Sequence, residues 1–211
     1  MRLYDISEPI SPATAVFPGD TPFSREWVMR LDAGASCNVS TVTMSVHCGT
    51  HADAPLHFVA DGADSASWSL DPYLGRCRVV HLSGHGEPPL LRPEDLTGER
   101  LTGVERLLVR TSASHDPTTF DAGFTALGPA AAEALVAAGV RLIGIDTPSM
   151  DHATSQELPA HHVLARGGVA ILENLDLSTV PPGEYELIAL PLRIVGSDSS
   201  PVRAVLRELS A

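Results

Sequence analysis

Two helix-and-strand units follow each other in the second half of this chain, and they restrict its fold more than any other feature. Segment 128–140 has a proline in its first turn, an alanine-rich body and a glycine near its end, which predicts a helix. The apolar run 141–146 follows at once. A shorter helix is predicted over 160–166, before two glycines and the run 169–174. This alternation predicts an α/β fold with a mixed sheet, not a bundle or a sandwich.

Short apolar runs predict further strands. Segment 38–47 alternates apolar and polar residues and is rich in β-branched side chains, so we expect a strand that carries His47 at its C-terminal end. Several other runs have consecutive apolar residues, which suits strands covered on both faces. These runs are 76–82, 106–111 and 186–192. We see no repeat and no linker, and we therefore expect a single compact domain over 1–211, with a mixed β-sheet core flanked by helices.

Composition narrows the class of partner. The chain has 14 basic and 26 acidic residues, and its formal net charge of −12 argues against nucleic acid or an anionic membrane as a partner. Three cysteines without CxxC spacing favour a reducing compartment. There is no apolar signal segment at the N-terminus and no run of about 20 apolar residues that could span a membrane. We therefore expect a soluble cytoplasmic protein.

Residues 47–58, HCGTHADAPLHF, hold three histidines and one aspartate. Imidazole nitrogen and carboxylate oxygen together suit zinc, and manganese also accepts such ligands. A glycine and a proline within the segment argue against a helix, so His47, His51 and Asp53 are expected at a strand end and in the turn after it. A lone histidine is more often a hydrogen-bonded structural residue, but three histidines beside an aspartate favour a metal site.

His57 has two interpretations. It lies four residues after Asp53 and could be a further ligand or a general acid and base, because imidazole exchanges protons readily near neutral pH. Spacing alone does not choose between these roles. A catalytic zinc commonly has three protein ligands and one open position, and His47, His51 and Asp53 already fill that count.

Further ligands elsewhere in the chain would imply a second metal. His161, in the predicted short helix, and Glu173, at the end of the following strand, are the candidates. Each has a simpler interpretation, since His161 could be solvated and Glu173 could form a salt bridge, and spacing does not separate His161 from His162. The remaining histidines have no ligand spacing and are expected at the surface or in structural roles: His81, His85, His115 and His152.

The segment HCGTHADAPLHF resembles the HxGTHxDxPxHF signature of the cyclase-like metal-dependent hydrolases. Other blocks are similar, in order and spacing, to the bacterial arylformamidase (kynurenine formamidase) branch of this family. These blocks are FPGDTPF (17–23), NVSTVTMSVHCGTHADAPLHF (38–58), RLIGIDTPSMD (141–151), ILENLDLSTVPPGEYELIALPL (171–192) and SPVRAVL (200–206). The resemblance implies a compact α/β fold and a homodimer. It also implies hydrolysis of an aromatic formamide, N-formyl-L-kynurenine, to L-kynurenine and formate in tryptophan degradation.

The resemblance further implies two zinc ions per subunit. By motif position, His47, His51 and Asp53 would bind the first ion. Asp53 would bridge to the second ion, which His161 and Glu173 would complete. In the family the helical histidine stands twelve residues before the glutamate, and His161 has that spacing here.

Two more residues take roles from the resemblance. His57 falls on the family's proton donor and acceptor. The family usually has tryptophan in contact with the substrate where Phe17 stands, and phenylalanine offers a smaller ring without an indole N–H. Two alternatives therefore stand beside the formamide substrate. One is a related cyclase-family hydrolase of another amide or a lactam such as isatin, with a different aromatic wall near Phe17. The other is a non-catalytic metal-binding protein, which would not need His57.

Overall fold

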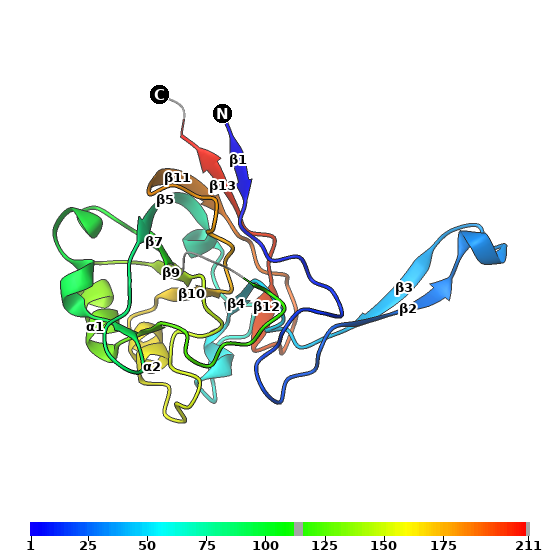
Figure 1. Ribbon diagram of the computed structural model, residues 1–211, viewed down its shortest axis with the longest axis horizontal. Coiled ribbons are helices and arrows are strands. Elements are labelled where there is room, and N and C mark those ends of the chain that lie inside the picture. Colours follow the sequence, from blue (N-terminus) through cyan, green and yellow to red (C-terminus); the bar gives the residue numbers. More distant parts are fainter. Residues whose placement is uncertain (112–115, 210–211) are drawn as a thin grey trace.

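The computed structural model describes residues 1–111 and 116–209, and its largest element is a nine-stranded mixed sheet (Figure 1). The order of its strands is β1-β13-β11-β5-β7-β9-β10-β4-β12. Four central strands run parallel: β5 (Leu74–His81), β7 (Arg106–Arg110), β9 (Leu142–Ile145) and β10 (Ala170–Glu173). Antiparallel strands flank them: β1 (Leu3–Asp5), β13 (Val205–Glu208) and β11 (Gly183–Ile188) on one side, β4 (His51–Asp53) and β12 (Ser199–Pro201) on the other. The predicted α/β class with a mixed sheet is confirmed.

A hydrophobic core lies on each face of the central strands. In β7, Leu107 and Val109 belong to one core and Leu108 to the other, because successive side chains of a strand point to opposite faces. Helices α1 (Pro129–Ala137) and α2 (Pro159–Arg166) pack against each other and cover the first face. The second core is closed by side chains from β1, β11 and β13. Burial on both faces explains why these strands are continuous apolar runs in the sequence.

Both predicted helices are confirmed. Helix α1 begins one residue later and ends three residues earlier than the predicted 128–140. Helix α2 begins one residue earlier than the predicted 160–166 and ends at the same residue. The predicted strand over 38–47 is wrong in its second half. Strand β3 (Val39–Thr43) ends four residues before His47, which lies in a turn. The strand expected over 186–192 begins earlier and ends at Ile188, as β11. In each case the hydrogen-bonded partner, not the apolar pattern, sets the limits of the strand.

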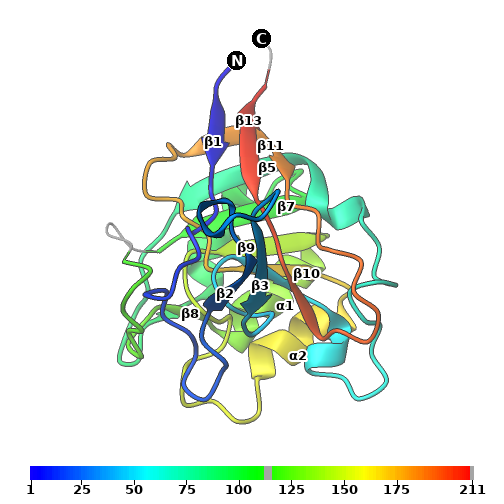
Figure 2. The same ribbon diagram turned by 90° about the vertical axis from the view of Figure 1, so that its right-hand side faces the viewer.

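Strand β3 pairs with β2 (Ser24–Met29) in a two-stranded sheet of its own, which we call the hairpin arm, residues 24–43. The arm projects from the rest of the molecule in Figure 1 and points toward the reader in Figure 2. Every residue of both strands is exposed. Its exposed apolar side chains are Trp27, Val28, Met29, Leu31, Val39 and Val42. The alternation of apolar and polar residues over 38–47 therefore indicates a strand, but this strand does not pack against the hydrophobic core.

The remaining elements are short. Strand β6 (Leu90–Leu91) pairs with β8 (Ala126–Leu127), and one-turn 3-10 helices lie at η1 (Leu31–Ala33), η2 (Pro55–His57), η3 (Asp71–Tyr73), η4 (Pro93–Leu96) and η5 (Gly98–Arg100). All three cysteines are free, and Cys48 and Cys77 are buried. Within 1–111 and 116–209, no helix has the length and apolar character needed to cross a membrane.

Candidate metal centre

His51 and Asp53 lie within strand β4, not in a turn after a strand as predicted, and β4 and β10 bring three of the predicted ligands onto one face of the sheet. The antiparallel register places Glu173 directly opposite His51. Asp53 lies two residues after His51, so its side chain points to the same face. All residues of β4 and β10 are buried, and His51, Asp53 and Glu173 are each at most 3% exposed. Two carboxylates and an imidazole therefore meet in the interior of the molecule, where unpaired charge is costly.

Helix α2 adds His161 to this group. The carboxylate of Asp151 accepts hydrogen bonds from the backbone N–H groups of Ala160 and His161, both at 3.0 Å. It also contacts Nδ1 of His161 at 2.7 Å. The opposite nitrogen, Nε2, then lies 3.3 Å from Glu173 Oε1 and 3.6 Å from Asp53 Oδ2. Asp151 thus holds both the start of the helix and the His161 ring, and sequence reasoning missed it.

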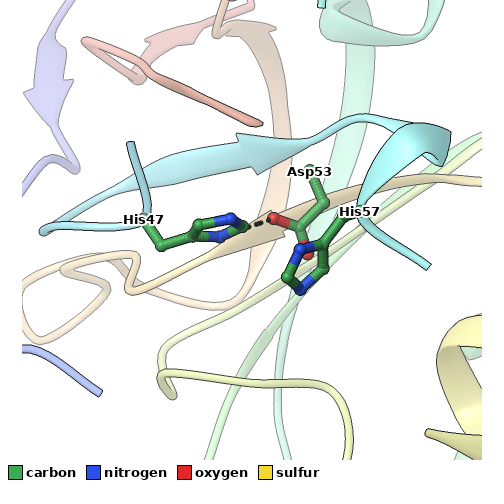
Figure 3. Close-up of side chains that lie close together, drawn as sticks. All are labelled: His47, Asp53 and His57. Carbon is green, nitrogen blue, oxygen red and sulfur yellow. Dashed lines mark ion pairs between the residues drawn. The ribbon is translucent and has the colours of Figure 1, made fainter. Parts of the chain in front are cut away.

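His47 approaches Asp53 from the turn that precedes β4. Its Nδ1 lies 3.2 Å from Asp53 Oδ1, and Figure 3 shows the rings of both His47 and His57 close to the Asp53 carboxylate. The two ring centroids are 4.3 Å apart. His57 stands at the end of η2, and its side chain is 32% exposed, against 1% for that of His51. His57 therefore lies at the solvent side of the group.

The donor atoms form two overlapping groups among the described residues. One atom each from His51, Asp53 and Glu173 lie within 4.8 Å of one another, and the same holds for His47, Asp53 and His57. Asp53 is common to both, as expected of a bridging ligand. The two oxygens of Asp53 separate the histidines: Oδ1 lies 3.2 Å from His47 Nδ1 and 3.4 Å from His51 Nε2, whereas Oδ2 lies 3.6 Å from His161 Nε2. His51 also lies 3.3 Å from Glu173, because the strand register places the two residues opposite each other.

The hydrogen-bonding pattern of the centre suits a bound cation. Nδ1 of His51 contacts the carbonyl oxygen of Gly49 at 2.8 Å, which requires a proton on Nδ1 and leaves the lone pair on Nε2. This Nε2 faces Glu173 and Asp53 at 3.3 and 3.4 Å. Within the described part of the chain, His51 Nε2 and both oxygens of Asp53 are buried without a hydrogen-bond partner. In the neutral form of His51, the lone pair of Nε2 and those of the Asp53 carboxylate would converge on a divalent metal.

Ion pairs among these side chains shift their pKa values. Burial alone would raise the pKa of Asp53, but contacts with His161 and His47 hold this pKa well below its usual value. Burial alone would lower the pKa of His47, but Asp53 and Asp198 outweigh it and raise this pKa to about 9. The carboxylates thus keep their charge because protonated imidazoles compensate it. A metal would supply the positive charge instead, and its binding would release protons.

Phe17 lies beside a cavity of about 270 Å³ near this group. Its ring meets that of Phe120 edge to face, with centroids 5.2 Å apart, and Phe124 also lines the cavity. None of the five predicted ligands is in the described lining, but Asn174, which follows Glu173, is. The Asn174 side chain donates a hydrogen bond to the carbonyl oxygen of Gly49. Part of the cavity wall is therefore aromatic, and Asn174 connects the wall along the chain to Glu173.

The other described histidines lie outside both donor groups. His81 contacts the carbonyl oxygen of Val180, His85 pairs with Asp95, and His152 contacts Thr154. His162 is half-buried, with its ring 6.4 Å from that of Phe58. Of the neighbours in α2, only His161 thus faces the carboxylates. His115 lies outside the described residues.

Comparison with known proteins gives consistent matches. Residues 4–152 match the protein family described as putative cyclase. A kynurenine formamidase of Bordetella avium (strain 197N) is 53% identical over 209 residues, which are 99% of each chain. Among solved structures, a potential metal-dependent hydrolase with cyclase activity is 28% identical, with a TM-score of 0.84 over 100% of this chain and 99% of that one. Isatin hydrolase A from Ralstonia solanacearum shares the fold, with a TM-score of 0.82 at 23% identity over 97% of this chain and 91% of that one.

Proposed function

This chain belongs to the cyclase family, and we propose that it hydrolyses N-formyl-L-kynurenine to L-kynurenine and formate at a centre of two zinc ions. The main observation in support of the metal centre is the buried Asp53 carboxylate, which lies among histidines and Glu173. Neither of its oxygens has a hydrogen-bond partner among the described residues. The relative that is 53% identical and named kynurenine formamidase supports the substrate. The chain is accordingly an amide hydrolase with a metal cofactor.

Zinc is the metal that the donor set favours. Three imidazoles and two carboxylates are the nitrogen and oxygen ligands of zinc enzymes, although manganese accepts them too. We propose that two ions would share Asp53. His47 and His51 would hold one of them on the Oδ1 side, and His161 and Glu173 would hold the other on the Oδ2 side. The contacts of the two Asp53 oxygens support this division.

When bound, zinc lowers the pKa of a water molecule and polarises a carbonyl group. We assign His57 to proton transfer because its side chain is the most exposed of the four histidines in the centre, and a base must reach the solvent and the substrate. His57 takes a proton from the water that attacks the formyl carbon. It then gives a proton to the aniline nitrogen as the C–N bond breaks, because an anilide anion is a poor leaving group.

The aromatic wall at Phe17 and Phe120 is the proposed contact for the substrate ring. Edge-to-face and offset-stacked arrangements suit such contacts, and an additional aromatic pair contributes about 0.5–1.5 kcal/mol beyond area burial. Asn174, which follows Glu173 in the chain, also lines this cavity, and this supports the cavity as the place of the substrate ring.

We also propose that two copies of the chain associate through the hairpin arm. An isolated two-stranded hairpin is marginally stable in water, and the exposed apolar side chains of this arm have no cover within the described chain. A second copy would bury them and stabilise the arm. A cytoplasmic location is supported by the three free cysteines.

The direct test measures metal content and turnover on one preparation. The zinc-loaded chain is incubated with N-formyl-L-kynurenine and, separately, with isatin, the substrate class suggested by the fold match to isatin hydrolase A. The proposal predicts rapid formation of kynurenine and at least tenfold slower opening of isatin. Turnover of isatin but not of N-formyl-L-kynurenine would support the metal centre and show that the proposed substrate is wrong. Bound metal without turnover of either compound would favour the non-catalytic alternative.

A further inference from the structure

One carboxylate oxygen outside the predicted ligand set contacts two histidines of the centre. Oδ2 of Asp198 lies 2.9 Å from Nε2 of His47 and 3.3 Å from Nδ1 of His57. An ionised carboxylate can only accept hydrogen bonds, so each of these two nitrogens carries a proton. When a ring carries only this one proton, as metal binding at His47 requires, its other nitrogen keeps a lone pair. For His47 this is Nδ1, the atom 3.2 Å from Asp53. For His57 it is Nε2.

The sheet holds Asp198 in this place. Asp198 immediately precedes β12, in which Ser199 is opposite Asp53 of β4. Its carbonyl oxygen accepts a hydrogen bond from the backbone N–H of Ala54 at 2.9 Å. The carboxylate therefore reaches over the end of β4 from an adjacent strand with a fixed register. This is a more rigid arrangement than a pair of long surface side chains would give.

Every histidine of the centre has one ring nitrogen in contact with an oxygen acceptor. His51 has its second nitrogen against the Gly49 carbonyl oxygen, and His161 has its second nitrogen against Asp151. In each ring one nitrogen meets an oxygen acceptor and the other faces the buried carboxylates or the solvent side. Metal-binding histidines commonly donate their second N–H to a carboxylate or carbonyl group, which fixes the tautomer and the ring orientation. Asp198 is distinctive because one oxygen serves two rings with different proposed roles.

We propose that Asp198 is a positioning residue that fixes the tautomers of His47 and His57 together. Resting on the proposed function, this assigns the Nδ1 lone pair of His47 to the metal and the Nε2 lone pair of His57 to the proton of the attacking water. A ligand and a base are thereby oriented by one group. Loss of the carboxylate would let both rings rotate and exchange tautomers.

The test is long-range ¹H–¹⁵N NMR of the histidine rings in the zinc-loaded protein at about pH 8, combined with zinc-release rates and steady-state kinetics. In the wild type, His57 should carry its proton on Nδ1. In Asp198→Ala, His57 should shift toward the Nε2–H tautomer, zinc should leave faster, and kcat should fall by about 10- to 100-fold, the usual effect of losing such a partner. KM should change less than kcat, because the effect is on orientation of the base.

Two further variants sharpen the test. Asp198→Asn keeps an oxygen acceptor of the same shape and should retain the His57 tautomer with a smaller loss of kcat. Asp64→Asn is the matched control, because Asp64 Oδ2 accepts the Gly196 N–H at 2.6 Å and so tethers the same loop without contact to either histidine. It should leave both tautomers unchanged.

An Nε2–H tautomer of His57 in the wild type would overturn the proposal outright. So would Asp198→Ala with unchanged tautomers, unchanged zinc release and less than twofold change in kcat. Equal effects of Asp64→Asn and Asp198→Ala would assign the role to the loop instead. Because the NMR and zinc-release measurements need no substrate, an error in the proposed substrate would leave this result unaffected.

Discussion

The hairpin arm and the metal centre come from neighbouring stretches of the chain, yet their surroundings are opposite. The arm ends at Thr43, and His47 follows four residues later. Every residue of the two arm strands is exposed, whereas every residue of β4 and β10 is buried. The arm exposes apolar side chains, and the centre buries the Asp53 carboxylate, whose oxygens have no hydrogen-bond partner among the described residues. We propose that each region is completed from outside the chain, by a second copy at the arm and by metal at the centre.

Metal removal should have the largest effect, and it should act on the centre alone. Chelation is expected to abolish turnover. A ligand at about a thousand times its Kd stabilises a fold by about 4 kcal/mol. For a chain of this size, loss of this stabilisation on metal removal should lower Tm by about 10 °C. Calorimetric melting curves and activity before and after chelation check this. Full turnover and an unchanged Tm in a verified metal-free sample would contradict the metal hypothesis.

The next largest effect is expected at His57. His57→Ala should retain both metals and lose turnover by about 10²- to 10⁴-fold, the usual scale of general acid and base catalysis. Metal content and rate are measured on one preparation, beside His162→Ala as a control from outside both donor groups. Loss of one equivalent of metal from His57→Ala would show instead that this histidine is a ligand.

Changes to the arm should alter assembly without altering the centre. Replacing Trp27 and Val28 together by serine removes apolar surface that the second copy would cover, and should convert a dimer into a 22.3 kDa monomer. Glu26→Gln, exposed on the same strand, is the control. Light scattering after size exclusion gives the mass, and metal analysis gives the occupancy. A wild-type monomer, or a double variant that stays dimeric, would remove the arm from the interface.

The smallest effect is expected at the cavity wall. Phe17→Ala should raise KM for N-formyl-L-kynurenine by about 2- to 10-fold and leave kcat nearly unchanged, since a ring contact of about 0.5–1.5 kcal/mol acts equally on the ground and transition states. Phe17→Trp should remain active. Steady-state kinetics are compared with melting curves of both variants. An unchanged KM with a large fall in Tm would show that Phe17 packs against Phe120 only for stability.

The parts of the molecule that could be predicted are those whose signal is local. The two helices have a proline at the start and glycines at the end, and the ligands of the first motif lie within seven residues. The alternation over 38–47 predicted a strand but could not say whether its apolar face would be covered, and in the arm it is not. Asp151 and Asp198 were missed because only the fold brings them to His161, His47 and His57. The pairing of His51 with Glu173 likewise depends on strand register.

The most direct measurement is anomalous diffraction at the zinc absorption edge from crystals of the zinc-loaded protein. The account predicts two peaks per subunit, both at about 2.0–2.2 Å from oxygens of Asp53. One should also contact His47 and His51, and the other His161 and Glu173, with His57 bound to neither. A fully active, zinc-loaded crystal with no anomalous peak at the Asp53 carboxylate would contradict the central claim that this buried charge is there to hold metal.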